Sequence, residues 1–210
     1  MSTPIKNIIF DLGGVLFDID YILTINAFAQ IGVNNFDKIF TQKSQADLFN
    51  RFEEGKISLE GFTMELSEIS GKNLNNKDVA QALNTMLFNM EARRFDLLSA
   101  LKGRYRLFLY SNINEVHAEE IHRILKLTHG IENLEAHFEK VYYSHELGIR
   151  KPNTEGFLSI VNAHELNADE TLFIDDSPQH VEGAKKAGLQ AVWLDLNQKD
   201  IHELVEEMGL

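Results

Sequence analysis

The chain has 210 residues, 44% of them apolar, a formal net charge of -12 and no cysteine. This length suits one domain with a sizeable core, or a core domain with a small insertion. The composition excludes disulfides, a thiolate nucleophile and a thiolate metal site, and the negative charge argues against surfaces that bind nucleic acid or anionic membranes.

No stretch of the sequence has the length and apolar character of a membrane span. The N-terminus, MSTPIKNIIF, lacks the basic region and the long apolar core of a signal peptide, so we expect a cytoplasmic protein. A small phosphorylated metabolite remains compatible with the net charge, because a few local donors and a metal cation reverse the field in one pocket. We expect no nucleic-acid or membrane partner. The oligomeric state is left open, and a monomer is compatible with the sequence.

Short apolar segments alternate with helical stretches along most of the chain. Five segments rich in aliphatic and aromatic residues are predicted to be buried strands: Asn7–Phe10, Arg106–Tyr110, Val141–Tyr143, Thr171–Ile174 and Ala191–Leu194. Four stretches are predicted helices: Asn114–Lys126, Thr154–His164, Gln179–Ala187 and, at the surface of the tail, Lys199–Met208. This alternation predicts an α/β fold, with a Rossmann-like parallel sheet that is covered on both faces.

The stretch from about residue 21 to residue 90 breaks this alternation. Its apolar residues recur at helical spacing, as in IDYILTINAFAQIG and LEGFTMELSEIS, and no segment in it has the pattern of a strand. Ser58 is a predicted helix start, and Gly32, Gly55 and Gly71 are predicted helix ends. The stretch is too long for a bare loop. We therefore predict a helical cap over residues 19–90, inserted after the first strand of a core formed by residues 1–18 and 91–210.

Polar side chains stand at the ends of four predicted strands. In open α/β sheets, ligands bind beyond the carboxyl ends of the strands. In chain order these ends carry a carboxylate, a hydroxyl with an amide, two cations and a pair of carboxylates: Asp11, Ser111 with Asn112, Arg150 with Lys151, and Asp175 with Asp176. Parallel strands bring these groups to one edge of the sheet, so we expect them to form one site.

Each of these groups, taken alone, has a structural explanation. An aspartate after a strand often caps the next helix or turn, and for Asp11 alone that explanation is preferred. The segment RKP is an ordinary helix entry, with Pro152 near the first turn. The adjacent carboxylates of Asp175 and Asp176, however, repel each other unless a cation or hydrogen-bond donors offset their charge. Capping is a weak explanation for all four strand ends at once.

The chemistry that uses this set of groups is phosphoryl transfer through an aspartate. A carboxylate nucleophile splits hydrolysis into formation and breakdown of an aspartyl phosphate. Asp11 would repel an incoming phosphate, so a divalent cation must bridge the two, and the carboxylates of Asp11 and Asp176 suit Mg²⁺. Ser111 can donate a hydrogen bond to a phosphoryl oxygen, and Lys151 can offset negative charge on the nucleophile and the phosphate.

The motifs FDLGGVL, LYSN, RKP and FIDD occur in an order that resembles the haloacid dehalogenase-like (HAD) hydrolase superfamily, and they span residues 10 to 176. The helical stretch between the first two motifs resembles the small cap that many members insert there. Two further segments, RFEEGKIS and DDSPQHVEGAKKAGLQA, resemble the sugar-phosphate phosphatases that include bacterial glucose-1-phosphatases. The resemblance implies a HAD-like core with a cap, and a hydrolase that acts on phosphoric monoesters.

The resemblance also implies a nucleophile and a metal site. The family pattern makes Asp11 the nucleophile. With Asp11, the Gly13 backbone carbonyl and the Asp176 carboxylate complete the protein's share of the Mg²⁺ shell. Asp175 is implied to support Lys151 or a metal-bound water.

Phosphate binding is implied for the next two strand ends. Ser111 and the Asn112 backbone hold the phosphoryl group, and Lys151 is the charge-balancing lysine. The family often has an acidic residue four positions beyond the metal aspartate, where this chain has His180. A histidine there can contact the metal shell, bind phosphate or cap the helix, and we expect it to support the metal ligands or to cap.

Gly13 is a second departure from the family pattern. Most phosphatases of the superfamily carry an aspartate two residues after the nucleophile as general acid and base, and positioned proton transfer is worth about 10²–10⁴-fold in rate. The substrate can have a stable leaving group, such as the anomeric oxygen of a sugar 1-phosphate, or Asp18, Asp20 or His117 can supply the proton. Alternatively, the protein binds phosphoesters with weak catalysis. For Asp20 a turn role is preferred, and a lone histidine such as His117 more often packs or faces solvent.

The missing acid also raises a rival enzyme of the same superfamily, a metal-independent 2-haloacid dehalogenase. Halide leaves without a proton, so such an enzyme needs no acid. Without a metal, however, the pair Asp175–Asp176 beside Asp11 would repel the anionic substrate. We therefore favour the metal-dependent phosphatase, with sugar phosphates as the first candidates.

The predicted cap can close over a small substrate and exclude water. Phe49, Phe52 and Glu53, in the segment LFNRFEEG, are candidates to line the substrate pocket. A place in the cap core is an equal alternative for the two phenylalanines, and an exposed position is the commoner one for a glutamate. A small capped pocket disfavours protein and nucleic-acid substrates.

Overall fold

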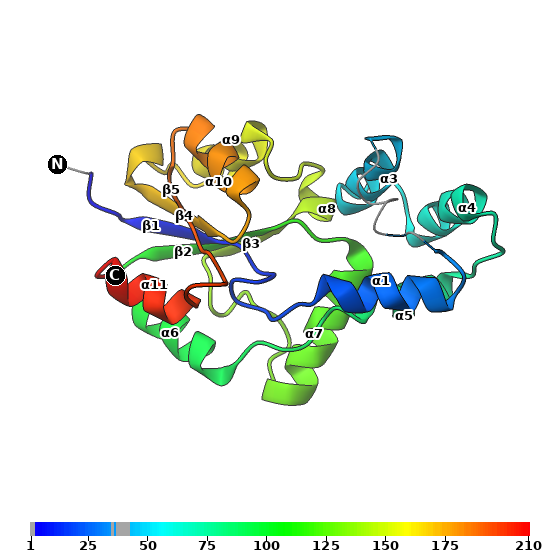
Figure 1. The fold of residues 1–210 in the computed structure, drawn as a ribbon. Coiled ribbons are helices and arrows are strands. Elements are labelled where there is room, and N and C mark those ends of the chain that lie inside the picture. The colour runs from blue at the N-terminus through cyan, green and yellow to red at the C-terminus, as the bar shows by residue number, and fades with distance from the viewer. Residues whose placement is uncertain (1–2, 35, 37–42) are drawn as a thin grey trace.

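A five-stranded parallel sheet forms the centre of the computed structural model, which describes residues 3–34, 36 and 43–210 and, for residues 43–46, only the backbone (Figure 1). Its strands are β1 (Asn7–Phe10), β2 (Arg106–Ser111), β3 (Lys140–Tyr143), β4 (Thr171–Asp175) and β5 (Gln190–Trp193). Neighbouring strands pair in parallel, in the order β3-β2-β1-β4-β5. The predicted α/β fold is confirmed, and each predicted strand end lies within one residue of the observed end.

Helices cover both faces of this sheet. One face carries α9 (Thr154–Ala163) and α10 (Pro178–Lys186), with the 3₁₀ turn η1 (Ala168–Glu170) before β4; the other carries α6 (Ala92–Lys102), α7 (Glu115–His129) and α11 (Ile201–Glu207). Successive side chains of a strand point to opposite faces. Ile8 and Phe10 therefore pack in the same cluster as α6, α7 and α11, and Ile9 packs with α9 and α10. Burial on both faces explains why the strands are continuous apolar runs.

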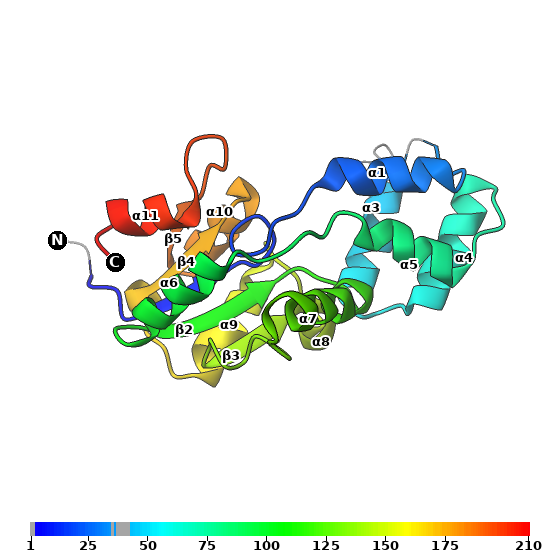
Figure 2. The same cartoon turned by 90° about the horizontal axis from the view of Figure 1, so that it is seen from below.

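A second group of helices lies beyond the carboxyl-terminal edge of the sheet (Figure 2). It consists of α1 (Tyr21–Gln30), α3 (Lys43–Glu53), α4 (Leu59–Ser70) and α5 (Asn76–Asn84). These helices share their own hydrophobic cluster, which includes Phe28 and Phe62. The glycines predicted as helix ends, Gly32, Gly55 and Gly71, follow α1, α3 and α4 and have positive φ angles, as is usual after a helix. We call this group the cap and the sheet with its helices the core.

Side-chain caps mark several of the helices that the sequence predicted, although α10, which was also predicted, follows Ser177 without one. The Ser58 hydroxyl accepts a hydrogen bond from the Gly61 backbone N–H at the start of α4, as predicted. Two helices that were not predicted, α6 and the short α8 (Ser144–Leu147), follow Glu91 and Tyr143, neither of which makes a side-chain cap. Without a capping residue, only the apolar spacing in ARRFDLLSALK marks α6.

The two segments that connect core and cap run side by side. The Asp18 N–H donates to the Asn89 carbonyl at 2.8 Å, and an antiparallel bridge pairs Ile19 with Leu87. The division into core residues 1–18 and 91–210 and cap residues 19–90 stays a prediction, and positions 1–2, 35 and 37–42 of these ranges lie outside the described residues. The paired connection gives the cap a defined place over the strand ends.

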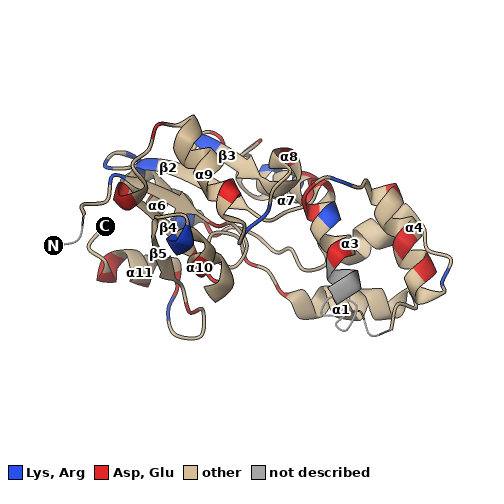
Figure 3. Ribbon diagram, turned by 90° about the horizontal axis from the view of Figure 1, so that it is seen from above, with Lys and Arg blue, Asp and Glu red and all other residues tan. Residues whose placement is uncertain are grey.

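Charged residues occur on both the core and the cap (Figure 3). Asp and Glu number 32 against 20 Lys and Arg, and acidic positions are visible on α3, α4 and α11, with basic positions on α10. The excess of negative charge is therefore not confined to one surface. Within the described part of the chain, no helix has the length and the apolar character needed to cross a membrane.

Candidate active site

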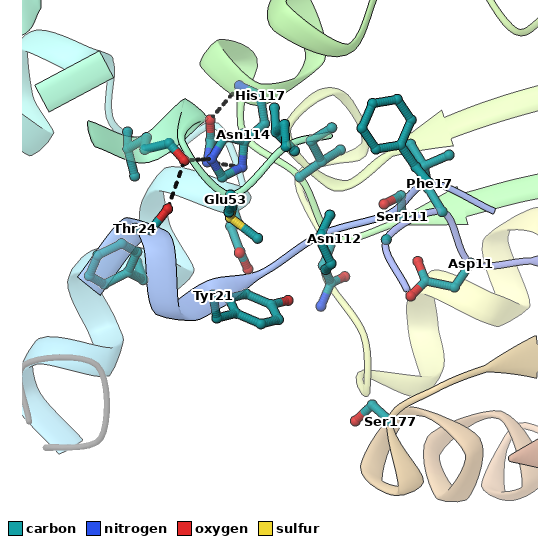
Figure 4. Close-up of a pocket in the computed structure, with 18 of the residues that line it drawn as sticks. Asp11, Phe17, Tyr21, Thr24, Glu53, Ser111, Asn112, Asn114, His117 and Ser177 are labelled. Carbon is teal, nitrogen blue, oxygen red and sulfur yellow. Dashed lines mark hydrogen bonds between the residues drawn. The ribbon is translucent and has the colours of Figure 1, made fainter. Parts of the chain in front are cut away.

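A pocket of about 690 Å³ lies between the strand ends and the cap (Figure 4). Core residues that line it include Asp11, Gly13, Ser111, Asn112, Asp176 and His180, and cap residues include Tyr21, Phe49 and Glu53. Asp11 follows β1, where its N–H donates to the Ile174 carbonyl at 2.9 Å. The parallel register thus brings groups from remote parts of the sequence to one edge of the sheet, as predicted from the residues at the strand ends.

A buried lysine joins two of the strand-end carboxylates. Lys151 Nζ lies 2.7 Å from Asp11 Oδ1 and 2.6 Å from Asp175 Oδ2. Lys151 and Asp175 have no exposed surface, and Asp11 is 7% exposed. Burying charges costs several kcal/mol of desolvation, which their mutual attraction often fails to offset. A contribution to stability is therefore a weak explanation for this cluster. Buried clusters of titratable groups beside a pocket are typical of functional sites.

The Lys151 side chain is positioned from its backbone outward. The Asn112 amide brackets that backbone: its Oδ1 accepts from the Lys151 N–H at 2.8 Å, and its Nδ2 donates to the Lys151 carbonyl at 2.9 Å. The ammonium lies 5.6 Å and 5.2 Å from the ring centroids of Tyr110 and Phe173, within the range of cation–π attraction. Asn112 therefore orients Lys151 through its side chain, a contact that the sequence did not predict.

The charges around Lys151 shift the pKa values of the carboxyl groups. Burial raises the pKa of Asp11 to about 8; the attraction of Lys151 opposes this shift, and the negative charges of Asp175 and Asp176 add to it. Burial also raises the pKa of Asp176, as does the neighbouring Asp175. Burial alone would raise the pKa of Asp175, but Lys151 and His180 outweigh it and lower that pKa to about 2. Negative charge therefore exceeds positive charge at the floor of the pocket.

The residues at this floor fit a hard divalent cation. Carboxylate oxygens are the ligands that Mg²⁺ prefers, and a cation would offset the excess negative charge. Asp11, Asp175 and His180 each offer a ligand atom, and these atoms lie within 4.8 Å of one another. Gly14 has a φ of +78°, and a Cβ there would lie 2.4 Å from Asp176 Oδ2. The backbone thus approaches the Asp176 carboxylate as closely as only glycine permits.

Neighbouring side chains hold Asp175 and Asp176 in place. His180 Nδ1 lies 3.0 Å and 3.1 Å from the two oxygens of Asp175, and the Ser177 N–H donates to Asp175 Oδ1 at 2.7 Å. The Trp193 indole N–H donates to the Asp176 carbonyl at 2.9 Å. Sequence reasoning missed Trp193, although it is the only tryptophan of the chain and stands at the end of a strand.

Core and cap contact each other beside the pocket through Arg150 and Glu53. The Nε and Nη2 atoms of Arg150 both lie 2.8 Å from Glu53 Oε2, and Arg150 Nη1 donates to Asn50 Oδ1 at 2.7 Å. Behind them, a Cβ on Gly55 would lie 2.2 Å from the His145 carbonyl oxygen. The end of α3 is therefore docked closely on the core, next to the loop that carries Lys151.

The three predicted pocket residues of α3 are placed differently. Glu53 lines the pocket and is paired with Arg150, and Phe49 also lines it. Phe52 does not line the pocket in the described part of the chain. Its ring stacks on Phe62, with centroids 4.6 Å apart, and is 1% exposed. Phe52 thus takes the alternative that the sequence left open, a place in the cap core.

The acid candidates that follow Gly13 do not reach the pocket. Asp18 Oδ1 lies 2.7 Å from Arg94 Nη2, and Asp18 does not line the pocket in the described residues. Asp20 caps α1, where its Oδ1 accepts from the Ile22 N–H at 2.8 Å. This placement does not support Asp18 as the source of the proton. For Asp20 it agrees with the preferred structural role.

His117 lines the pocket, but both of its ring nitrogens are engaged. Nε2 lies 3.1 Å from the Leu83 carbonyl oxygen and Nδ1 lies 3.2 Å from Asn114 Nδ2. An amide nitrogen can only donate, so Nδ1 accepts and Nε2 carries the proton that it donates to Leu83. Burial lowers the pKa of His117 to about 4, so the ring is neutral near pH 7. His117 therefore ties α7 of the core to α5 of the cap.

Tyr21 is a pocket residue that sequence reasoning missed. It is the first residue of α1 and lines the pocket from the cap side. Figure 4 shows its ring reaching towards Asn112, with the hydroxyl on the side that faces Asp11. Asp20 could have pointed to Tyr21 in the sequence, because a helix N-cap at Asp20 places the next residue in the first helical turn.

Three comparisons relate this site to known proteins. Residues 5–188 match the family model of haloacid dehalogenase-like hydrolases. The chain is 30% identical over 186 residues to a D-ribitol-5-phosphate phosphatase of Bacteroides thetaiotaomicron, a match that covers 89% of this chain and 90% of that protein. It is 26% identical over 212 residues to a sesquiterpene phosphatase of Aspergillus oryzae, and this match covers both proteins in full.

A solved structure agrees with these matches. A HAD family enzyme of Bacteroides thetaiotaomicron, in complex with magnesium and inorganic phosphate, is similar to this chain with a TM-score of 0.84 and 30% identity. The match covers 95% of this chain and 98% of that enzyme. The similarity therefore extends over core and cap together.

Proposed function

Because this chain belongs to the haloacid dehalogenase-like hydrolase family and is a hydrolase, we propose that it is a Mg²⁺-dependent phosphatase acting on a small phosphomonoester through an aspartyl phosphate on Asp11. The observation that carries the proposal is the buried Lys151 ammonium, 2.7 Å from Asp11 and 2.6 Å from Asp175 at the pocket floor. Further support comes from two relatives that are phosphatases and from a related enzyme that binds magnesium and phosphate.

In the first step, an Asp11 carboxylate oxygen attacks phosphorus and forms a new P–O bond, while the ester P–O bond breaks and its electron pair leaves with the alcohol oxygen. Ser111 donates its hydroxyl to a phosphoryl oxygen, together with the Asn112 backbone. Lys151 offsets the negative charge of Asp11 and of the phosphoryl group. A bound Mg²⁺, held by Asp11, the Gly13 carbonyl and Asp176, would supply the remaining positive charge.

In the second step, a water molecule attacks phosphorus of the aspartyl phosphate. The bond between phosphorus and the Asp11 oxygen breaks, inorganic phosphate is released, and the Asp11 carboxylate is restored. The Arg150–Glu53 pair keeps the cap on the core beside this site. A closed cap excludes other water from the aspartyl phosphate and limits the substrate to a small molecule.

The test is a panel of phosphoesters with Mg²⁺, measured for the wild type, for Asp11→Asn and for Asp169→Asn. Asp169 is exposed and remote from the pocket, so it is the matched control. We expect turnover by the wild type and the control, and folded but inactive Asp11→Asn. Full activity of Asp11→Asn would refute the nucleophile. Ligand-induced thermal shifts without turnover by any variant would instead favour a protein that only binds phosphoesters.

Removal of the metal separates the phosphatase from the rival dehalogenase. EDTA should abolish phosphatase activity, because without the metal the excess carboxylate charge repels the phosphate. Added Mg²⁺ should restore the activity. A metal-independent dehalogenase would release halide from a 2-haloacid equally well with EDTA. Halide release in the chelator would overturn the proposed function.

Sugar and polyol phosphates are the first candidate substrates, since one relative is a D-ribitol-5-phosphate phosphatase. The lining of the pocket supports a second candidate. On the cap side it includes the apolar side chains of Ile25, Phe36, Phe49 and Leu83, which suit an organic group with an apolar part. A sesquiterpene phosphatase is also among the relatives. The panel should therefore pair polyol phosphates with prenyl and alkyl phosphates, and the ratio of their kcat/KM values decides between the two.

A further inference from the structure

The proposed phosphatase lacks an obvious source for the proton that its leaving group needs. Gly13 has no side chain, and an alkoxide is a poor leaving group unless it is protonated as the P–O bond breaks. A donor must lie on the leaving-group side of the phosphoryl group. In an in-line displacement this side is opposite the Asp11 oxygen, and it therefore faces the cap.

Most polar residues of the pocket are already engaged. Both ring nitrogens of His117 have partners. The Glu53 carboxylate accepts hydrogen bonds from Arg150. The Thr24 hydroxyl donates to carbonyls of the cap, with Leu83 O at 3.0 Å. His180 is bound through Nδ1 to Asp175, on the nucleophile side of the site. None of these groups offers a free proton towards the cap side.

Tyr21 is different. Among the described residues, its hydroxyl has no hydrogen-bond partner, although it lines the pocket together with Asp11 and Asn112. Figure 4 shows the ring extending from α1 towards Asn112, with the hydroxyl directed to the space before Asp11. The backbone at this point is fixed, because the Asp20 carboxylate caps α1 at the Ile22 N–H. The residue is 57% exposed, so the pocket mouth leaves room for a substrate beside it.

We propose that Tyr21 is the general acid of this enzyme, an inference that rests on the proposed phosphatase function. As the ester P–O bond breaks, the Tyr21 O–H bond also breaks and its proton passes to the alcohol oxygen, leaving a phenolate. In the second step the phenolate takes a proton from the water that attacks the aspartyl phosphate. The hydroxyl and the Asp11 carboxylate are both restored, and the sum is ester plus water giving alcohol plus phosphate.

The acid strength of a phenol suits this role. An unperturbed tyrosine has a pKa of about 10, so it keeps its proton at pH 7 and is still a stronger acid than an aliphatic alcohol. Although the residue as a whole is 57% exposed, partial desolvation in the pocket raises the pKa of Tyr21 further, and the negative charges of Glu53 and Asp11 add to this shift. The phenolate formed in the first step is therefore a strong base, as the second step requires.

The test compares Tyr21→Phe with the wild type on two substrates: an alkyl phosphate and p-nitrophenyl phosphate, whose leaving group departs without a proton. The ratio kcat/KM reports only steps up to cleavage of the ester bond. We expect kcat/KM for the alkyl ester to fall by about 10²–10⁴-fold and that for the aryl ester to stay nearly unchanged. Tyr105→Phe, outside the pocket, is the matched control.

The outcomes separate this inference from the proposed function. Equal losses on both esters would show that Tyr21 only binds or shapes the site, and no loss on either would show that another group or a water gives the proton. Either result overturns the inference while phosphatase activity stands. Absence of wild-type turnover of p-nitrophenyl phosphate and of every other ester would refute the proposed function, and the inference with it.

Discussion

Arg150 of the core and Glu53 of the cap form an ion pair at 2.8 Å beside the pocket, one residue before the buried Lys151. The two residues are 97 positions apart in the chain. Because Arg150 also binds Asn50 of α3, the cap is joined to the loop that carries Lys151. The placement of the cap and that of the Lys151 loop are therefore linked.

Loss of this ion pair should weaken substrate binding. Glu53→Gln keeps the shape of the side chain and removes its charge, so the docked cap loses about 0.5–1 kcal/mol, as expected for a partly exposed pair. We expect KM to rise about 2- to 5-fold, with a smaller change in kcat. Glu54→Gln, whose carboxylate pairs with Lys56 at the surface, is the control and should leave KM unchanged. An unchanged KM in Glu53→Gln would contradict the link.

Gly14→Ala should reduce the affinity for Mg²⁺. The new Cβ would lie 2.4 Å from Asp176 Oδ2, so that carboxylate must move. We expect affinity to fall by about 10–100-fold, as for other changes next to metal ligands. Fluorescence of Trp193, the sole tryptophan, gives the measurement, because its indole is bonded to the Asp176 carbonyl.

Gly71→Ala is a matched control for the backbone. Gly71 has a φ of +66°, and no atom of the described residues lies within 4 Å of the added Cβ. The substitution brings about 1–2 kcal/mol of backbone strain without touching a carboxylate. It should lower stability and leave the Mg²⁺ titration unchanged. A similar loss of Mg²⁺ affinity in both variants would show that strain, and not contact with Asp176, is the cause.

Asp11→Asn should become more stable relative to the wild type as the pH rises. In the metal-free protein the pKa of Asp11 is raised from 3.8 to about 8, so the folded state favours the protonated carboxyl. The stability that this group contributes is present below pH 3.8 and is lost as the pH rises to about 8. Asparagine does not titrate. Thermal unfolding in EDTA should therefore show a difference in Tm that grows from pH 4 to pH 8; a difference that shrinks would disprove the excess of negative charge.

Lys151→Met should destabilise the fold strongly. It leaves Asp11 and Asp175 buried without their cation, and breaking a buried ion pair costs about 3–5 kcal/mol. Denaturant unfolding measures this loss, and phosphatase activity should disappear with it. Lys186→Met is the control, because Lys186 is exposed and, within the described part of the chain, forms an ion pair only with Glu182 across one helical turn. Its free energy of unfolding should stay within about 0.5 kcal/mol of the wild type.

The strand ends show how much of the site was predictable. Asp11, Ser111, Lys151 and Asp175 were placed together from the sequence, because parallel strands carry their carboxyl ends to one edge whatever the length of chain between them. The same rule cannot place a side chain that follows a turn. Asp18 lies only seven positions after Asp11, yet it pairs with Arg94 and not with the pocket.

The amino-acid sequence by itself determined the α/β core, the helical cap and the set of strand-end groups. The spacing of apolar residues and the capping of helices depend on residues that are neighbours in the chain. The tertiary structure alone decided that Glu53 meets Arg150 and that Phe52 turns into the cap core. It also decided that the Tyr21 hydroxyl lies at the pocket without a partner among the described residues. These relationships depend on how two packed units dock. Docking is set by shape and charge across contacts between remote segments, which no local pattern records.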